Sequence, residues 1–145
     1  MQLSFSEKNI LHLLTILESI EKIKIYSNGY TNPDVFFYSD DQLPFNASCH
    51  LLLAISEETK KLDENLKDEF AFIAWNQVSG LRNRIAHDYR GIDPEVIFQI
   101  ISFELDALKE ACINMLKLMH IPAEKLNDYL KTSFYSHLNY LIVDL

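Results

Sequence analysis

Three arginines and one histidine lie within nine residues of this sequence, between Arg82 and Arg90. A histidine, with a usual pKa of about 6.5, exchanges a proton near neutral pH and serves as a general acid or base. Arginine donates hydrogen bonds to phosphate oxygens and stabilises the negative charge that develops on them. RNA carries its own nucleophile, the 2′-hydroxyl, so this combination is sufficient in principle for cleavage without a metal ion. The segment from Arg82 to Tyr89 is therefore the candidate functional site.

A helix through this segment sorts its side chains by direction. At about 100° per residue, one sector holds four apolar residues: Ala74, Val78, Leu81 and Ile85. Three polar residues lie away from that stripe: Asn83, Arg84 and His87. Arg82 and Tyr89 fall at the edge of the apolar stripe. The pattern predicts that His87 points to solvent or to another subunit, so that a single chain holds only half of a site.

A structural explanation of the same residues fits the spacing equally well. Cations in the last turn of a helix interact favourably with the helix dipole. Arg84, His87 and Arg90 would satisfy that role without any chemistry. Spacing alone leaves both interpretations open.

Other kinds of chemistry find little support in the chain. Its five histidines are His12, His50, His87, His120 and His137, and no two have the i, i+4 spacing of a helical metal site. There is no glycine-rich phosphate loop and no nucleophile elbow. Cys49 and Cys112 form no CxxC motif and are interpreted as core residues of a reduced protein. We therefore expect neither a metal nor a bound cofactor, and assign His120 and His137 to structure or surface.

The net charge and the apolar content limit which kinds of partner the protein can bind. The 145 residues carry a formal net charge of −8, which argues against electrostatic binding of nucleic acid over an extended surface. Any contact with RNA must be local, and an acidic surface is equally consistent with a basic protein partner or with solubility. No apolar run reaches the roughly 18 residues that span a bilayer, and from the N-terminal residues we expect no signal peptide. The expectation is a cytoplasmic protein without a membrane partner.

Apolar residues at helical spacing predict four main helices, at about 6–26, 46–62, 70–89 and 94–119. Residues 35–45 are expected to form a loop packed on the core by its aromatics, with a helix extending into this region as the alternative, and residues 63–69 a charged connection. Asp93-Pro94-Glu95 is typical of a helix start. Two short helical patterns follow Pro122. The prediction is an all-α, up-and-down bundle in one domain, 1–145, with a core at about 5–120 and a helical extension at about 121–145.

The motif residues also resemble a known family. Arg82-x4-His87-x-Tyr89 is similar to the R-x4-H-x-Y motif of HepT-type toxins of the HEPN superfamily, and the flanks from Gly80 to Asp93 look like that family's neighbourhood. The run from Leu53 to Glu58 resembles its second-helix pattern, with Ser56 where a glycine is expected. The resemblance covers about residues 5–120.

This resemblance implies a homodimer in which two motif helices form one HEPN cleft. It implies that Arg82 and His87 are catalytic for metal-independent RNA cleavage. Supporting phosphate contacts would come from Asn83, Arg84 and Arg90. The implied partner is an MNT-type nucleotidyltransferase antitoxin, which would use ATP to transfer AMP to Tyr89 and so block RNA phosphates by charge and bulk.

Three hypotheses follow. The leading one is an endoribonuclease toxin of a type VII-like toxin–antitoxin module. The second is a non-catalytic HEPN interaction module that binds a nucleotidyltransferase and is modified by it. The third is a plain helical adaptor in which Arg82, His87 and Tyr89 are all dispensable.

Overall fold

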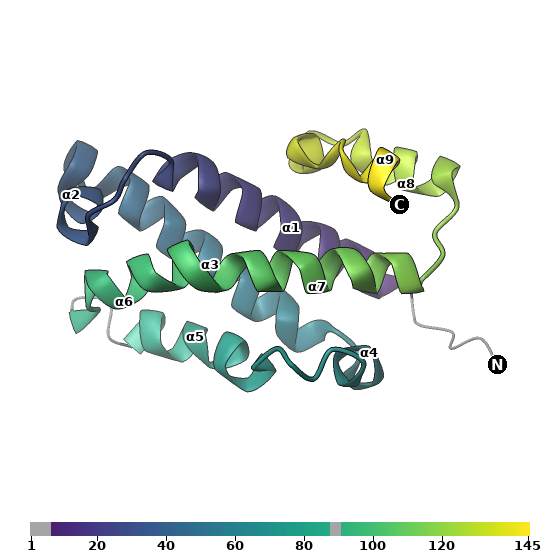
Figure 1. The fold of residues 1–145 in the computed structure, drawn as a ribbon, viewed down its shortest axis with the longest axis horizontal. Helices are drawn as coiled ribbons and strands as arrows, with labels where there is room; N and C mark the ends of the chain where they lie inside the picture. Colours follow the sequence, from purple (N-terminus) through teal and green to yellow (C-terminus); the bar gives the residue numbers. More distant parts are fainter. Residues whose placement is uncertain (1–6, 88–90) are drawn as a thin grey trace.

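Helices form all the regular structure in the computed structural model, which describes residues 7–87 and 91–145 (Figure 1). The long elements are α1 (Lys8–Ser27), α3 (Leu43–Lys61), α5 (Trp75–His87) and α7 (Leu105–Leu118). Helix α3 packs between α1 and α5, and α7 lies against α1. The predicted all-α, HEPN-like bundle is confirmed.

Much of the predicted loop at 35–45 is instead helical: residues 33–38 form an α-helix and α3 already begins at Leu43, whereas Asp40 and Asp41 between them have left-handed backbone angles (φ 50° and 55°). Helix α2 (Pro33–Tyr38) is followed by a short 3-10 segment, η1 (Ser39–Gln42). The side chain of Asn32 caps α2 by accepting hydrogen bonds from the backbone N–H groups of Asp34 and Val35, at 2.9 and 3.1 Å. An Asn-Pro pair therefore starts a helix here. Phe36 is fully buried, as expected for an aromatic anchor of this segment.

The charged connection before the motif helix also contains a short helix, α4 (Glu64–Asp68). Helix α5 begins at Trp75, about five residues later than predicted, after a series of turns. The Trp75 indole N–H donates to the carbonyls of Lys67 and Phe70, at 3.2 and 3.1 Å, and so ties the start of α5 to these turns. Ala74 lies before the helix and is exposed, so its assignment to the core stripe was wrong.

The fourth predicted helix has a π-helical turn in its middle. Helix α6 (Pro94–Gln99) runs into the π turn η3 (Ile100–Glu104) and then into α7. The predicted start is confirmed, because the Asp93 side chain accepts from the N–H of Glu95 at 2.9 Å. Buried residues on this rod, Ile97, Ile101 and Leu105, are separated by four residues each time. Such spacing drifts around an α-helix of 3.6 residues per turn, and a wider π turn keeps all three facing inward.

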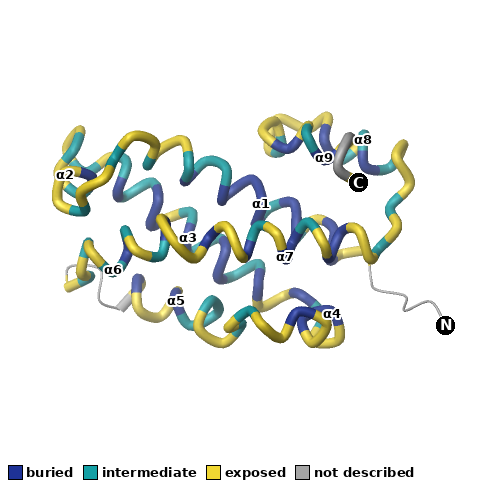
Figure 2. The backbone as a smooth tube through the Cα atoms, in the orientation of Figure 1, coloured by how far each residue is buried: buried dark blue, intermediate teal, exposed yellow. Residues whose placement is uncertain are grey.

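The core runs along the inner faces of α1, α3 and α7 (Figure 2). Both cysteines belong to it, as predicted: Cys49 and Cys112 are buried and unbonded to each other. Burial raises the pKa of each thiol to about 12, because desolvation disfavours the thiolate. No helix in the described ranges is both long enough and apolar enough to cross a bilayer.

The C-terminal extension comprises α8 (Ala123–Leu130), the 3-10 segment η4 (Ser133–Leu138) and α9 (Leu141–Asp144), and it lies over α1 (Figure 1). The buried carboxylate of Glu18 accepts a hydrogen bond from the backbone N–H of His137 at 3.1 Å. The hydroxyls of Thr15 and Tyr135 lie 3.1 Å apart. These contacts hold the extension against α1.

Candidate functional site

The last two turns of α5 carry the basic residues of the motif. Leu81 and Ile85 are buried, at 7% and 2% exposure, and turn one face of the helix to the core. Arg82 and Asn83 are exposed on the remaining surface. Helix α5 ends at His87. The direction of the His87 side chain, and the predicted roles of Tyr89 and Arg90, concern atoms outside the described residues.

Arg82 is held by an acidic residue of the neighbouring helix. Its Nε forms an ion pair with Oε1 of Glu57 on α3, at a distance of 2.6 Å. Both side chains are about half exposed, at 48% and 42%, so the pair lies at the surface. This contact is made by Nε, and the two Nη atoms carry four of the five N–H donors of the guanidinium. The sequence analysis did not predict the contact between Glu57 and Arg82, although Glu57 lies in the segment from Leu53 to Glu58 that resembles the family's second helix.

Ser56, next to Glu57, connects the same two helices by hydrogen bonds. Its buried hydroxyl donates to the carbonyl of Ser79 at 2.8 Å and accepts from the backbone N–H of Arg82 at 3.2 Å. A small side chain at this position permits the close approach of α3 and α5. The hydroxyl thus fixes how α3 meets α5, and it sets Glu57 beside the Arg82 side chain.

Arg84 is exposed, as predicted, but it does not share the flank of Arg82. It lines two hollows between α5 and the rod formed by α6 and η3, with volumes of about 180 and 400 Å³. Residues two apart on a helix project roughly 200° from each other. Arg82 and Arg84 of one chain therefore serve opposite flanks of α5.

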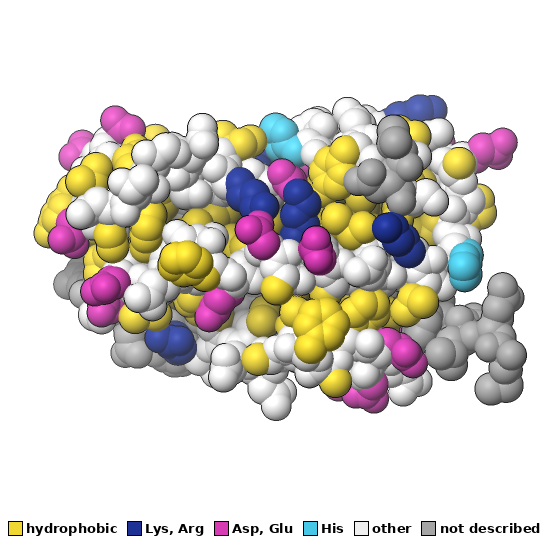
Figure 3. Space-filling model, viewed as in Figure 1, with side chains coloured by type: hydrophobic (Ala, Val, Ile, Leu, Met, Phe, Trp, Pro, Cys, Tyr) yellow, Lys and Arg dark blue, Asp and Glu magenta, His cyan; other side chains and the backbone are white. Residues whose placement is uncertain are grey.

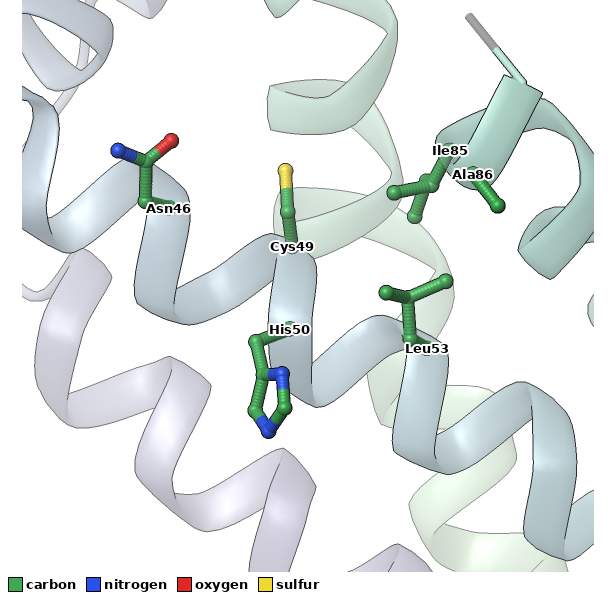
Figure 4. A pocket seen from close by; sticks show the side chains of 6 residues that line it. All are labelled: Asn46, Cys49, His50, Leu53, Ile85 and Ala86. Carbon is green, nitrogen blue, oxygen red and sulfur yellow. The ribbon is translucent and has the colours of Figure 1, made fainter. Parts of the chain in front are cut away.

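A depression of about 370 Å³ lies on the other flank, between α3 and α5. Figure 4 shows Leu53 of α3 and Ile85 of α5 pointing toward one another across it. Cys49, Ala86, Asn46 and His50 complete its lining. The surface beside the end of the motif helix is thus largely apolar.

Residues 16–115 match the family model described as ribonuclease HepT-like. The chain belongs to this family. The matched segment includes α3, α5 and most of α7, and it contains the whole Arg82–Tyr89 motif. The resemblance predicted from the motif is confirmed for a HepT-like HEPN protein.

Two relatives illustrate the range of the family. The chain is 28% identical over 107 residues to a Methanocaldococcus jannaschii protein named "Gamma-glutamylcyclotransferase and putative RNase", a match that covers 74% of this chain and 47% of the relative. It is 26% identical over 98 residues to "Probable ribonuclease HepT" of Thermococcus cleftensis, covering 68% of this chain and 86% of the relative. The chain thus spans about half the length of the first protein. No solved structure matches the chain.

The described part of this HepT-like chain contains no group of three or more His, Cys, Asp or Glu side chains arranged to hold a metal ion. His12, on α1, is engaged with Glu58 of α3, with Nδ1 2.5 Å from Oε2. His120 and His137 are exposed and lie far along the chain from the motif. The expectation of a site without metal or cofactor stays a prediction.

Proposed function

We propose that this HepT-like protein is a metal-independent endoribonuclease that acts as the toxin of a toxin–antitoxin module. The observation that carries the proposal is the exposed side chain of Arg82, which lies on the helix that ends at His87 and is oriented by an ion pair with Glu57 of α3. Membership of the ribonuclease HepT-like family supports it. We expect the protein to act in the cytoplasm, where its RNA substrate is.

The proposed reaction is transfer of the RNA phosphate to the neighbouring 2′-oxygen. His87 accepts the proton of the 2′-hydroxyl while the oxygen attacks phosphorus and the bond to the 5′-oxygen breaks. The leaving 5′-oxygen takes a proton from an imidazolium or from water, which yields a 2′,3′-cyclic phosphate and a 5′-hydroxyl. The Nη donors of Arg82 stabilise the charge that gathers on the phosphate oxygens. Asn83, Arg84 and Arg90 would contact neighbouring phosphates.

The proposed active form is a homodimer in which two motif helices meet. Because Arg82 and Arg84 serve opposite flanks of one α5, a second arginine for the same phosphate would come from the partner copy. The largely apolar depression between α3 and α5, with Ala86 exposed at its edge, offers a surface for that contact. The basic patches of the two copies would then combine in one cleft, and their local positive charge would offset the overall charge of −8.

The proposed antitoxin is an MNT-type nucleotidyltransferase. It would transfer AMP from ATP to the hydroxyl of Tyr89, forming a bond from the tyrosine oxygen to the α-phosphorus and releasing pyrophosphate. The product adds a negative charge and a nucleotide beside the cleft, so it would repel and obstruct RNA phosphates.

The test is cleavage of total RNA in excess EDTA by the wild type and by the His87→Ala and Arg82→Ala variants. We expect cleavage by the wild type and its loss in both variants. His120→Asn is the matched histidine control, because this exposed residue has a left-handed backbone (φ 49°) that asparagine tolerates. Equal cleavage by wild type and His87→Ala would refute the proposal.

The net charge favours a second candidate, a non-catalytic HEPN module that binds and is modified by a nucleotidyltransferase. It predicts a stable complex and AMP on Tyr89, with no cleavage by the free protein. Intact mass after co-expression, compared between wild type and Tyr89→Phe, distinguishes the two when combined with the cleavage assay.

A further inference from the structure

A groove of about 400 Å³ separates α5 from the rod formed by α6, η3 and α7. Figure 3 shows hydrophobic side chains exposed along the seam between these helices. Two phenylalanines that line it are almost fully exposed, Phe72 at 73% and Phe103 at 79%. An aromatic ring left in water forgoes the stabilisation of burial, so a pair on one groove indicates a binding surface.

Both rings are set in place by their own elements. Phe103 lies in the π turn η3, between the inward-facing Ile101 and Leu105, and is therefore directed outward. π turns often occur at functional sites. The ring of Phe72 makes an edge contact with that of Phe70, which is itself buried, with centroids 6.2 Å apart. The fold thus sets the positions of both exposed rings in the groove.

The polar lining of the groove suits an uncharged ligand with hydrogen-bonding edges. Gln77 and Gln99 contribute exposed amides, each with donors and an acceptor. Arg84 and Glu104 contribute one positive and one negative charge, which cancel. Nucleobases have this chemistry: they stack on aromatic rings, and amide side chains read their edges.

We propose that this groove binds unpaired nucleobases of single-stranded RNA beside the proposed cleavage site. This deepens the proposed function and rests on it. Arg84 connects the two regions, because it lines the groove and belongs to the same helical turns as Arg82. The phosphates of the bound RNA lie along the exposed face of α5, and its bases stack on Phe72 and Phe103. Stacking supplies affinity that a chain of net charge −8 cannot obtain from phosphate contacts alone.

The test measures binding of a fluorescently labelled, single-stranded oligonucleotide by anisotropy, in a His87→Ala background that prevents cleavage. We expect Phe72→Ala and Phe103→Ala each to weaken binding about tenfold. Phe134→Ala is the matched control, because that phenylalanine is 74% exposed but lies on the C-terminal extension.

The proposal is overturned if the Phe72→Ala/Phe103→Ala double variant binds the single strand as tightly as its parent, or if a duplex of equal length binds equally well. It is also overturned if the double variant keeps its RNA affinity but loses a nucleotidyltransferase partner, because the groove would then be a protein docking surface. Loss of RNA cleavage in His87→Ala alone tests the proposed function separately. If the wild type cleaves RNA, and the double variant cleaves and binds RNA as well as the wild type does, only the proposal about the groove is refuted.

Discussion

Glu57 offers a sharp perturbation of the candidate site, because charge and position can be removed separately. In Glu57→Gln an amide oxygen can still lie beside Nε of Arg82, but the negative charge is gone. In Glu57→Ala both are lost. The Nε to Oε1 distance is 2.6 Å, and the two side chains are about half exposed. An ion pair this exposed contributes about 0–1 kcal/mol to stability, so neither variant should unfold the protein.

The expected magnitudes follow from the geometry. A phosphate bound to the Nη edge of Arg82 would lie roughly 6 Å from the Glu57 carboxylate, and two like charges at that distance repel by about 0.7 kcal/mol in water. Glu57→Gln should therefore tighten RNA binding about threefold. Glu57→Ala should bind RNA no more weakly than wild type, yet cleave saturating RNA about tenfold more slowly, because the guanidinium is no longer aimed.

The assay combines two measurements. Dissociation constants come from anisotropy in the His87→Ala background, and single-turnover cleavage rates at saturating RNA come from the His87 protein, with EDTA throughout. Asp128→Asn is the matched control, since it makes the same change in net charge at an exposed ion pair with Lys131, on the C-terminal extension. It should alter neither quantity.

The reasoning is refuted if Glu57→Ala cleaves saturating RNA as fast as wild type. It is also refuted if Asp128→Asn tightens binding as much as Glu57→Gln, because the effect would then come from overall charge. Thermal unfolding of each variant separates either result from a loss of structure.

Three further changes test the supports of the site and the fold. Ser56→Ala removes the two hydrogen bonds between α3 and α5, which should cost about 1 kcal/mol and lower the Tm by about 2–4 °C; an unchanged Tm would contradict the role given to this hydroxyl. Glu18→Ala removes the carboxylate that accepts from the N–H of His137, so it should cost about 2 kcal/mol in chemical denaturation. Limited proteolysis should then cut the C-terminal extension faster, and unaltered digestion would count against this anchor. Because the pKa of Cys49 and of Cys112 is raised to about 12, roughly one part in ten thousand of each is thiolate at pH 8, and a thiol reagent should label them only after unfolding; rapid labelling of the folded protein would show that they are accessible.

Much of the fold could be predicted from local patterns in the sequence. The spacing of apolar residues on α1, α3 and α7 reflects burial on one side of each helix, and Asp93-Pro94 marks a helix start that the structure reproduces. Residues 35–45 were predicted as a loop because Asp40, Asp41 and Pro44 interrupt the apolar pattern, and this obscured the helix start at Asn32. The π turn was missed although the two successive four-residue spacings around Ile101 signal it.

The sequence by itself determined where the candidate site lies and which family the chain resembles, because a motif is a property of neighbouring residues. A helical wheel also gave the outward direction of Asn83, since direction around an axis depends only on position along it. The tertiary structure alone decided what each side chain meets. Glu57 reaches Arg82, and Phe72 shares a groove with Phe103, only because packed helices bring distant segments together in one particular register. That register depends on contacts such as the buried hydroxyl of Ser56, which no local pattern encodes.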